Sequence, residues 1–175
     1  MKRASLRTIT ALLLLAAPAC YEFDFPLDVK REVKVDERLL GSWGCLSSEN
    51  DADGGRLNLT ITKSDATTMS FKADFVSDDD KKEGTTFDVY GSTLAPGRFL
   101  NVRDTGEKAD GKWSFIRYSL LLPNVLRIEL VNDEPFKDLP KNQALLRSAI
   151  QKRIGDPSVY SEYCVCVRFK PKTAN

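Results

Sequence analysis

Eight short runs of alternating apolar and polar residues constrain the fold of this chain more than any other feature. Side chains of a β-strand point alternately to two faces, so such a run predicts a strand with one buried face. In residues 56–63, for example, Leu57, Leu59 and Ile61 alternate with polar residues. The expected strands are residues 39–46, 56–63, 68–75, 85–93, 98–103, 112–122, 125–131 and 162–169.

Turn signals separate these runs, among them Asp53-Gly54-Gly55, Ala95-Pro96-Gly97 and Pro123-Asn124. Such residues favour turns because of their backbone freedom, their fixed φ or their side-chain hydrogen bonds to the local backbone. Eight short strands at this spacing indicate an antiparallel barrel or a sandwich. We predict a mainly β fold, an antiparallel eight-stranded barrel of the lipocalin-like shape, with one α-helix before the last strand.

The helix is expected in the one segment that breaks the alternation, between Asp138 and Gly155. Pro140 suits a first helical turn, and Gly155 followed by Asp156-Pro157 ends the helix. Apolar residues recur there at helical spacing, at Leu139, Leu146, Ile150 and Ile154. We expect this helix to pack on the sheet or to close one end of the barrel, because amphipathic helices mostly cover cores. A lid over a cavity is the alternative.

The chain begins with the pattern of a secretory signal. Three basic residues precede an apolar stretch over residues 9–19, and small residues come directly before Cys20. The ending Ala17-Pro18-Ala19-Cys20 resembles the lipobox of bacterial lipoproteins, in which the cysteine becomes the first mature residue and carries lipid. Ordinary cleavage at the same place, which would release an unlipidated protein, is the alternative. An uncleaved anchor is disfavoured, because the apolar stretch is shorter than the roughly 20 residues that span a bilayer.

The lipoprotein resemblance implies a membrane anchor made by acyl chains on Cys20. Each buried CH₂ group contributes about 0.8 kcal/mol, so two or more chains anchor a protein stably. Tyr21 stands where an Asp would favour inner-membrane retention in this family, which implies the outer membrane, facing the periplasm or the surface. We therefore expect a signal peptide over residues 1–19, a lipid anchor and tether over residues 20–37, and a barrel domain over residues 38–175.

Charge and composition exclude several classes of function. Removal of residues 1–19 takes away three basic residues and no acidic ones, so 23 of the 26 Lys and Arg remain against 25 Asp and Glu, a formal charge of −2. A nucleic-acid-binding domain would be clearly basic. The chain has no histidine, which excludes Ser-His-Asp and Cys-His catalysis and removes the commonest metal ligand. We expect no enzymatic activity, no catalytic residue, no cofactor and no nucleic-acid partner.

A Gly-x-Trp motif, Gly41-Ser42-Trp43, lies in the first expected strand, and Arg168 lies in the last. Together they resemble the lipocalin-like (calycin) barrels, in which a basic residue of the last strand packs across the tryptophan of the first. If Trp43 faces Arg168 in an antiparallel pair, the same register places Cys45 opposite Cys166 on the same face. One register then accommodates a cation–π pair and a cross-strand disulfide, and it closes the barrel with the two ends of the chain.

Three cysteines remain once Cys20 is assigned to lipid. Exported proteins form disulfides, and we expect one between Cys45 and Cys166, with Cys45–Cys164 as the alternative. A metal site built from three cysteines is a competing interpretation, since Cys164 and Cys166 point to the same face of a strand. No histidine completes such a site, so we favour the disulfide and expect no bound metal.

Two functions fit these expectations. A tethered barrel would hold a small apolar ligand, because several aromatic residues are candidates for its interior: Phe71, Phe75, Phe87, Trp113 and Phe115. The same rings are able to fill the core, as side chains do in small barrels. The alternative function is that of a structural or protein-interaction lipoprotein of the cell envelope, with no ligand and with an envelope protein as its partner.

Overall fold

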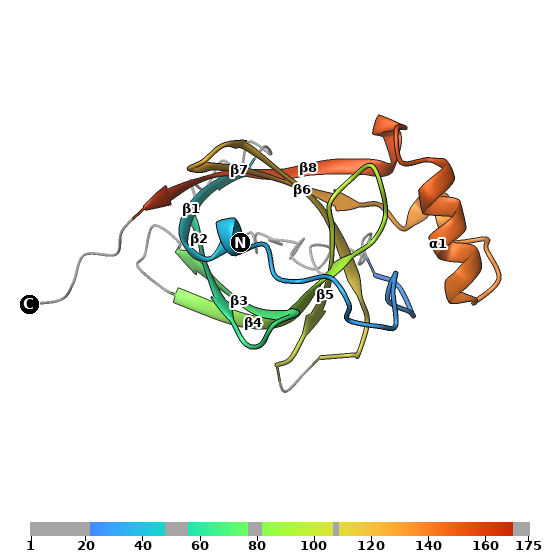
Figure 1. Ribbon diagram of the computed structural model, residues 1–175, viewed down its shortest axis with the longest axis horizontal. Coiled ribbons are helices and arrows are strands. Elements are labelled where there is room, and N and C mark those ends of the chain that lie inside the picture. The colour runs from blue at the N-terminus through green and yellow to red at the C-terminus, as the bar shows by residue number, and fades with distance from the viewer. Residues whose placement is uncertain (1–21, 48–55, 77–81, 107–108, 170–175) are drawn as a thin grey trace, which may run out of the picture.

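The computed structural model describes residues 22–47, 56–76, 82–106 and 109–169. Eight strands pair antiparallel in chain order, and the last strand pairs back with the first, so the sheet closes into a barrel. Figure 1 shows this ring of strands with the helix outside it. The prediction of a mainly β, eight-stranded antiparallel barrel with one helix before the last strand is confirmed.

The strands lie close to the alternating runs of the sequence. They are β1 (Gly41–Ser47), β2 (Arg56–Lys63), β3 (Thr68–Val76), β4 (Lys82–Ser92), β5 (Phe99–Asp104), β6 (Ser114–Leu122), β7 (Val125–Val131) and β8 (Tyr160–Phe169). β4 begins three residues earlier than expected, because its ladder with β3 continues as far as the pair Val76 and Lys82. β1 begins two residues later than expected, because Leu39 belongs to a short 3-10 helix, η1 (Glu37–Leu39).

Apolar side chains on the inward faces of the strands fill the barrel. Between β2 and β3, Leu59 pairs with Ala73 and Ile61 pairs with Phe71. All four side chains are buried in one continuous cluster. Phe87 packs half-buried against the same cluster. Phe71 and Phe87 are therefore part of the core, while the side chain of Phe75 lies outside the described part of the structure.

A second apolar core lies outside the barrel and holds the helix. In α1 (Gln143–Lys152), Leu146 and Ile150 are buried against outward-facing residues of β5, β6 and β7. The helix thus packs on the sheet, as expected, and does not serve as a lid. Asn142 caps its first turn by accepting a hydrogen bond from the Leu145 N–H, so Pro140 precedes the helix and is not in its first turn. Among the described residues, no helix is long and apolar enough to cross a bilayer.

Two aromatic residues that the sequence suggests for the barrel interior lie in this outer core instead. Phe115 is fully buried and Trp113 half-buried, and both pack in the outer core and not in the barrel interior. In β6, Ile116 and Tyr118 face the interior, which turns Phe115 outwards. Both faces of this strand carry apolar residues, so the alternation predicts the strand but not which face is inside.

The N-terminal strap, residues 22–40, also packs on the barrel. Phe23 and Trp113 exchange two backbone hydrogen bonds of 2.8 and 2.9 Å. Leu27 is fully buried, and its N–H donates to Asn101 Oδ1 at 2.7 Å. The sequence assigns residues 20–37 to a tether, but from Glu22 onwards this stretch belongs to the packed domain, because its apolar side chains complete both cores.

Asp28 fastens the middle of the strap to β4 and α1. Its carboxylate accepts hydrogen bonds from the Ser92 hydroxyl, from the Thr93 N–H at 2.9 Å and from Arg147 Nε at 2.9 Å. Burial alone would raise the pKa of Asp28, but these hydrogen bonds outweigh it and lower the pKa below its usual value. Further along the strap, Val33 crosses β4 at Gly91, where a Cβ atom would lie only 2.7 Å from Val33 Cγ1.

Candidate functional site

The seam between β1 and β8 brings together the residue pair that the sequence predicts. Trp43 lies opposite Arg168, whose guanidinium carbon is 4.5 Å from the centroid of the indole ring. Trp43 is fully buried, and its Nε1 donates a hydrogen bond of 2.7 Å to the carbonyl oxygen of Leu39. Arg168 Nη1 donates to the carbonyl oxygen of Leu40 at 3.1 Å. The cation–π contact and these hydrogen bonds hold η1 over the seam.

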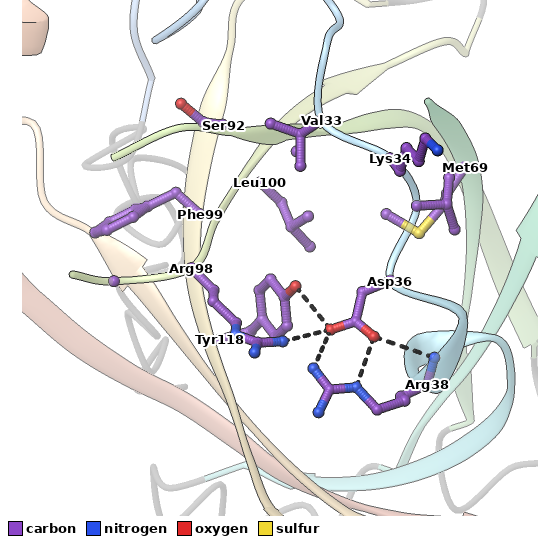
Figure 2. A pocket seen from close by; sticks show the side chains of 13 residues that line it. Val33, Lys34, Asp36, Arg38, Met69, Ser92, Arg98, Phe99, Leu100 and Tyr118 are labelled. Carbon is purple, nitrogen blue, oxygen red and sulfur yellow. Dashed lines mark hydrogen bonds and ion pairs between the residues drawn. The ribbon is translucent and has the colours of Figure 1, made fainter. Parts of the chain in front are cut away.

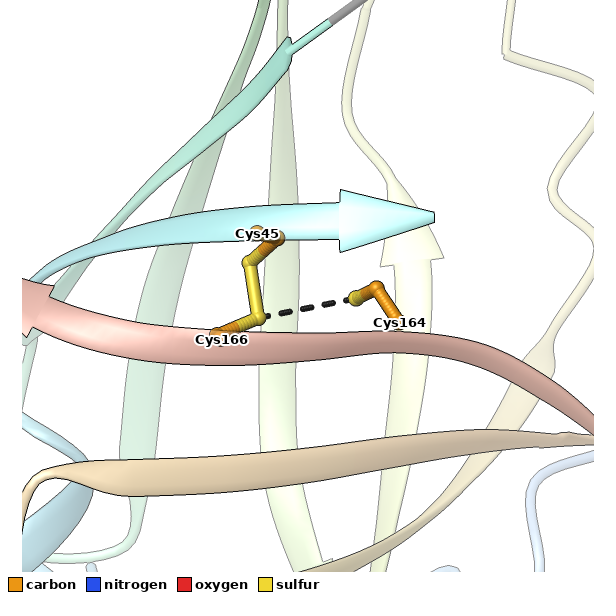
Figure 3. Close-up of side chains that lie close together, drawn as sticks. All are labelled: Cys45, Cys164 and Cys166. Carbon is orange, nitrogen blue, oxygen red and sulfur yellow. Dashed lines mark hydrogen bonds between the residues drawn. A yellow bond between two sulfur atoms is a disulfide. The ribbon is translucent and has the colours of Figure 1, made fainter. Parts of the chain in front are cut away.

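Cys45 and Cys166 form a disulfide two residue pairs further along the seam (Figure 3). Both residues are buried in the interior cluster. The disulfide joins residues 121 positions apart and closes the barrel covalently. The pairing is the one that the predicted register requires, and the alternative Cys45–Cys164 disulfide is not formed.

The predicted lipidation site lies outside the described residues. Cys20 and the signal sequence before it fall in residues 1–21, so acylation and export stay predictions. The described chain begins at Glu22, two residues after Cys20, and Phe23 is already buried.

One end of the barrel carries a polar cluster that the sequence analysis did not identify (Figure 2). Val35 and Leu39 of the strap join the interior cluster, and Asp36 lies between them. Arg38 binds the Asp36 carboxylate through Nε and Nη2 at 2.8 and 2.7 Å. Arg98 Nη1 donates to the same carboxylate at 2.6 Å, and the Tyr118 hydroxyl donates at 3.2 Å.

This cluster forms one side of a cavity of about 290 Å³, which we call the mouth pocket. Three basic side chains and one acidic side chain line it, namely Lys34, Arg38, Arg98 and Asp36. The remaining lining is mainly apolar and includes Val33, Met69, Phe99 and Leu100. The mouth pocket therefore combines a positively charged side with an apolar side.

The charge state of Asp36 limits what the mouth pocket can do chemically. Hydrogen bonds from Arg38 lower the pKa of Asp36, against the opposing effect of burial. Burial raises the pKa of Tyr118, which keeps its hydroxyl protonated near neutral pH. A carboxylate that stays ionised and is already hydrogen-bonded to three side chains is poorly suited to act as a general acid. The arrangement is suited to positioning Arg38 and Arg98 for binding.

A signal for this site was present in the sequence. Val33 and Val35 alternate with Lys34 and Asp36, which is the same period of two that identified the strands. Charged residues also flank this short run, and such a mixed sequence is equally typical of a solvated tether. Arg98 and Tyr118 carried no signal, because only the folded barrel brings them to Asp36.

Comparisons with known proteins assign no family to the chain. The sequence matches no known protein-family profile, and no curated protein matches it significantly. Among solved structures, a chain described as a "De novo design of a fluorescence-activating beta barrel" aligns with 78% of this chain and 99% of its own length. The TM-score is 0.43 and the sequence identity is 11%. The barrel fold of this protein therefore rests on its own strand pairing.

Proposed function

We propose that this protein is an exported, lipid-anchored barrel that binds a small anionic amphiphile in the mouth pocket. The observation that carries the proposal is one cavity in which three basic side chains stand against a single acidic one, beside an apolar wall. An anionic group would pair with Arg38 and Arg98, and an alkyl or aromatic group would lie against Met69 and Leu100. The Gly41-Ser42-Trp43 and Arg168 resemblance to lipocalin-like barrels is consistent with a binding role.

The two arginines are available for a ligand. Their side chains are 57% and 54% exposed for Arg38 and Arg98, while the Asp36 side chain is only 15% exposed. Each guanidinium group offers five N–H donors, and the bonds to Asp36 use only some of them. Asp36 fixes both side chains in place before binding, which reduces the entropy lost when the ligand binds.

The size of the mouth pocket limits the ligand. Pockets for drug-sized ligands occupy roughly 300–1,000 Å³, and the mouth pocket, at about 290 Å³, lies just below this range. The barrel interior behind it is filled by the side chains of the interior cluster. We therefore propose a short amphiphile that lies at the barrel end, and not a long apolar molecule inside the barrel.

The lipid anchor would hold this domain close to the membrane. Only Tyr21 and Glu22 separate Cys20 from the buried Phe23. Acyl chains on Cys20 would thus place the surface around Phe23 within about 10 Å of the lipid headgroups. Lys112 and Lys141, which both pair with Asp24, lie on this surface and would face the membrane.

Calorimetric titration of the purified protein with three eight-carbon ligands tests the binding function. Octanoate, octanol and octylamine share an alkyl chain and differ in charge. We expect octanoate to bind roughly 10- to 100-fold more tightly than octanol, since hydrogen bonds to a charged group contribute about 1.5–3 kcal/mol. Octylamine should bind more weakly than octanol, because the mouth pocket carries an excess of basic side chains.

Two variants locate the binding site. Arg98→Met keeps the apolar part of the side chain and leaves Asp36 bound to Arg38, so it should abolish most of the preference for octanoate over octanol. Lys152→Met removes an exposed charge at the end of α1 and should leave the preference unchanged. Equal binding of octanoate and octanol by the wild-type protein would refute the proposal.

Several exposed apolar side chains favour the second candidate function, that of an interaction protein of the envelope. Five large apolar side chains on β1, β6 and β8 are between 43% and 68% exposed: Leu46, Leu121, Leu122, Val167 and Phe169. Where such side chains gather into one patch, the patch often marks an interaction site. A photo-crosslinking residue at position 167 should then capture one discrete partner in cells, whereas the same residue at position 152 should not. Failure at both positions would count against this function.

A further inference from the structure

Three cysteines meet inside the barrel next to the seam (Figure 3). The Sγ atoms of Cys45, Cys164 and Cys166 all lie within 4.8 Å of one another, and all three residues are buried. Cys164 Sγ is 3.5 Å from Cys166 Sγ, while Cys166 is bonded to Cys45. The disulfide explains why two of these sulfur atoms are close, but it does not require the third.

Strand geometry brings the third sulfur to the pair. Cys164 and Cys166 are two residues apart on β8, so both side chains point into the barrel. Cys45 lies opposite Cys166 on β1, and Ser47 lies opposite Cys164 at the last rung of this ladder. Cys45 and Cys164 are therefore diagonal neighbours, and the three sulfur atoms form a compact triangle on the inner face.

Among the described residues, the group that could hold a metal at this place consists of these three sulfur ligands. On β7, Leu126 lies opposite Cys166 and Ile128 lies opposite Cys164, and both are buried apolar residues. The chain has no histidine. Arg168 lies two residues after Cys166 on β8, and its guanidinium group packs over Trp43.

The spacing suits an ion that binds three sulfur atoms. At a metal–sulfur distance of about 2.3 Å, trigonal coordination places the sulfur atoms about 4 Å apart. The observed triangle reaches this spacing if the bonded pair separates, since the sulfur atoms already lie within 4.8 Å. Structural Zn²⁺ needs four ligands, whereas soft thiolate ligands also select Cu(I). A three-sulfur site in apolar surroundings therefore fits Cu(I) better than Zn²⁺.

We propose that reduction of the Cys45–Cys166 disulfide creates a Cu(I) site formed by Cys45, Cys164 and Cys166. A protein or small-molecule dithiol supplies two electrons and two protons: its two thiols become a disulfide, and Cys45 and Cys166 become thiols. Cu(I) then binds the thiols as thiolates, and the displaced protons are released to the solvent. In the oxidised protein two of the three sulfur ligands are bonded to each other and cannot coordinate Cu(I). The bond that closes the barrel therefore also controls whether the metal binds.

Competition for Cu(I) against the colorimetric chelator bicinchoninate, without oxygen, tests this proposal on the purified protein. The reduced protein should bind one Cu(I) per chain, and the oxidised protein should bind none at the cluster. Cys20→Ser removes the cysteine outside the cluster and should not change the affinity of the reduced form. Cys164→Ser should weaken binding by more than the roughly 10- to 100-fold that loss of an outer-shell partner costs.

Two further measurements keep the test decisive. X-ray absorption at the copper edge should show three sulfur neighbours in the reduced wild-type protein and fewer in Cys164→Ser. Circular dichroism should show that both reduced proteins keep the β fold, because the β1–β8 ladder and the contact of Trp43 with Arg168 do not depend on the disulfide. Equal Cu(I) affinity of the reduced wild type and Cys164→Ser, or loss of the fold on reduction, would overturn the proposal.

Discussion

The disulfide at the seam should contribute a large share of the stability of the barrel. Cys45 and Cys166 are 121 residues apart. A cross-link over a loop of this length reduces the chain entropy of the unfolded state, which raises the free energy of that state by about 5 kcal/mol at 25 °C. Measured values for native disulfides are typically 2–5 kcal/mol. Domains are stable by only about 5–15 kcal/mol in total. Replacing both cysteines by alanine should therefore remove between about an eighth and all of the stability.

Equilibrium unfolding in guanidinium chloride, followed by the fluorescence of the two tryptophans, Trp43 and Trp113, measures this effect. The double variant Cys45→Ala with Cys166→Ala should lose about 2–5 kcal/mol relative to the oxidised wild type. Cys164→Ala is the matched control, because it removes a neighbouring buried sulfur and keeps the disulfide. A loss below about 1 kcal/mol in the double variant, or an equal loss in the control, would refute the view that the covalent seam stabilises the barrel.

Three other predictions concern the strap and the outer core. Gly91→Ala should cost about 1–3 kcal/mol in thermal unfolding, because its Cβ would lie 2.7 Å from Val33 Cγ1 and push the strap away; an unchanged Tm would contradict this. Ile150→Ala should cost about 2–5 kcal/mol and the half-exposed Leu145→Ala less than about 0.5 kcal/mol, and equal costs would count against helix docking. Asp28→Asn should cost about 1.5–3 kcal/mol at pH 7. The pKa of Asp28 is lowered in the fold, so this difference should shrink as the pH falls below about 4, and a pH-independent difference would argue against the ionised carboxylate.

Much of the barrel could be predicted because its information is local. Alternation within each run, such as Leu57, Leu59 and Ile61, identifies a strand and its buried face without knowledge of the partner strand. The closure between β1 and β8 is not local, but one register explained Trp43 with Arg168 and also Cys45 with Cys166. Two independent pairs in the same register supplied the long-range information that a single motif lacks.

The mouth pocket and the packing of the strap could not be predicted, because they depend on contacts between residues far apart in the sequence. Asp36 meets Arg98 and Tyr118 across 62 and 82 residues of sequence, and nothing in its neighbourhood indicates these partners. Leu27 likewise depends on Asn101, which is 74 residues away. Mixed charge and apolar residues are typical both of solvated linkers and of a segment that packs on one side only. Tertiary contacts decide between the two.

Native mass spectrometry of the protein extracted from membranes tests the proposed function most directly. Removal of residues 1–19 leaves 156 of the 175 residues, and we expect this chain to begin at Cys20 with the mass of its acyl groups added. We also expect a bound anionic amphiphile that is lost in Arg98→Met and kept in Lys152→Met. A chain that retains residues 1–19, an unmodified Cys20, or a protein that carries no anionic ligand in any preparation would contradict the proposal of a lipid-anchored binding barrel.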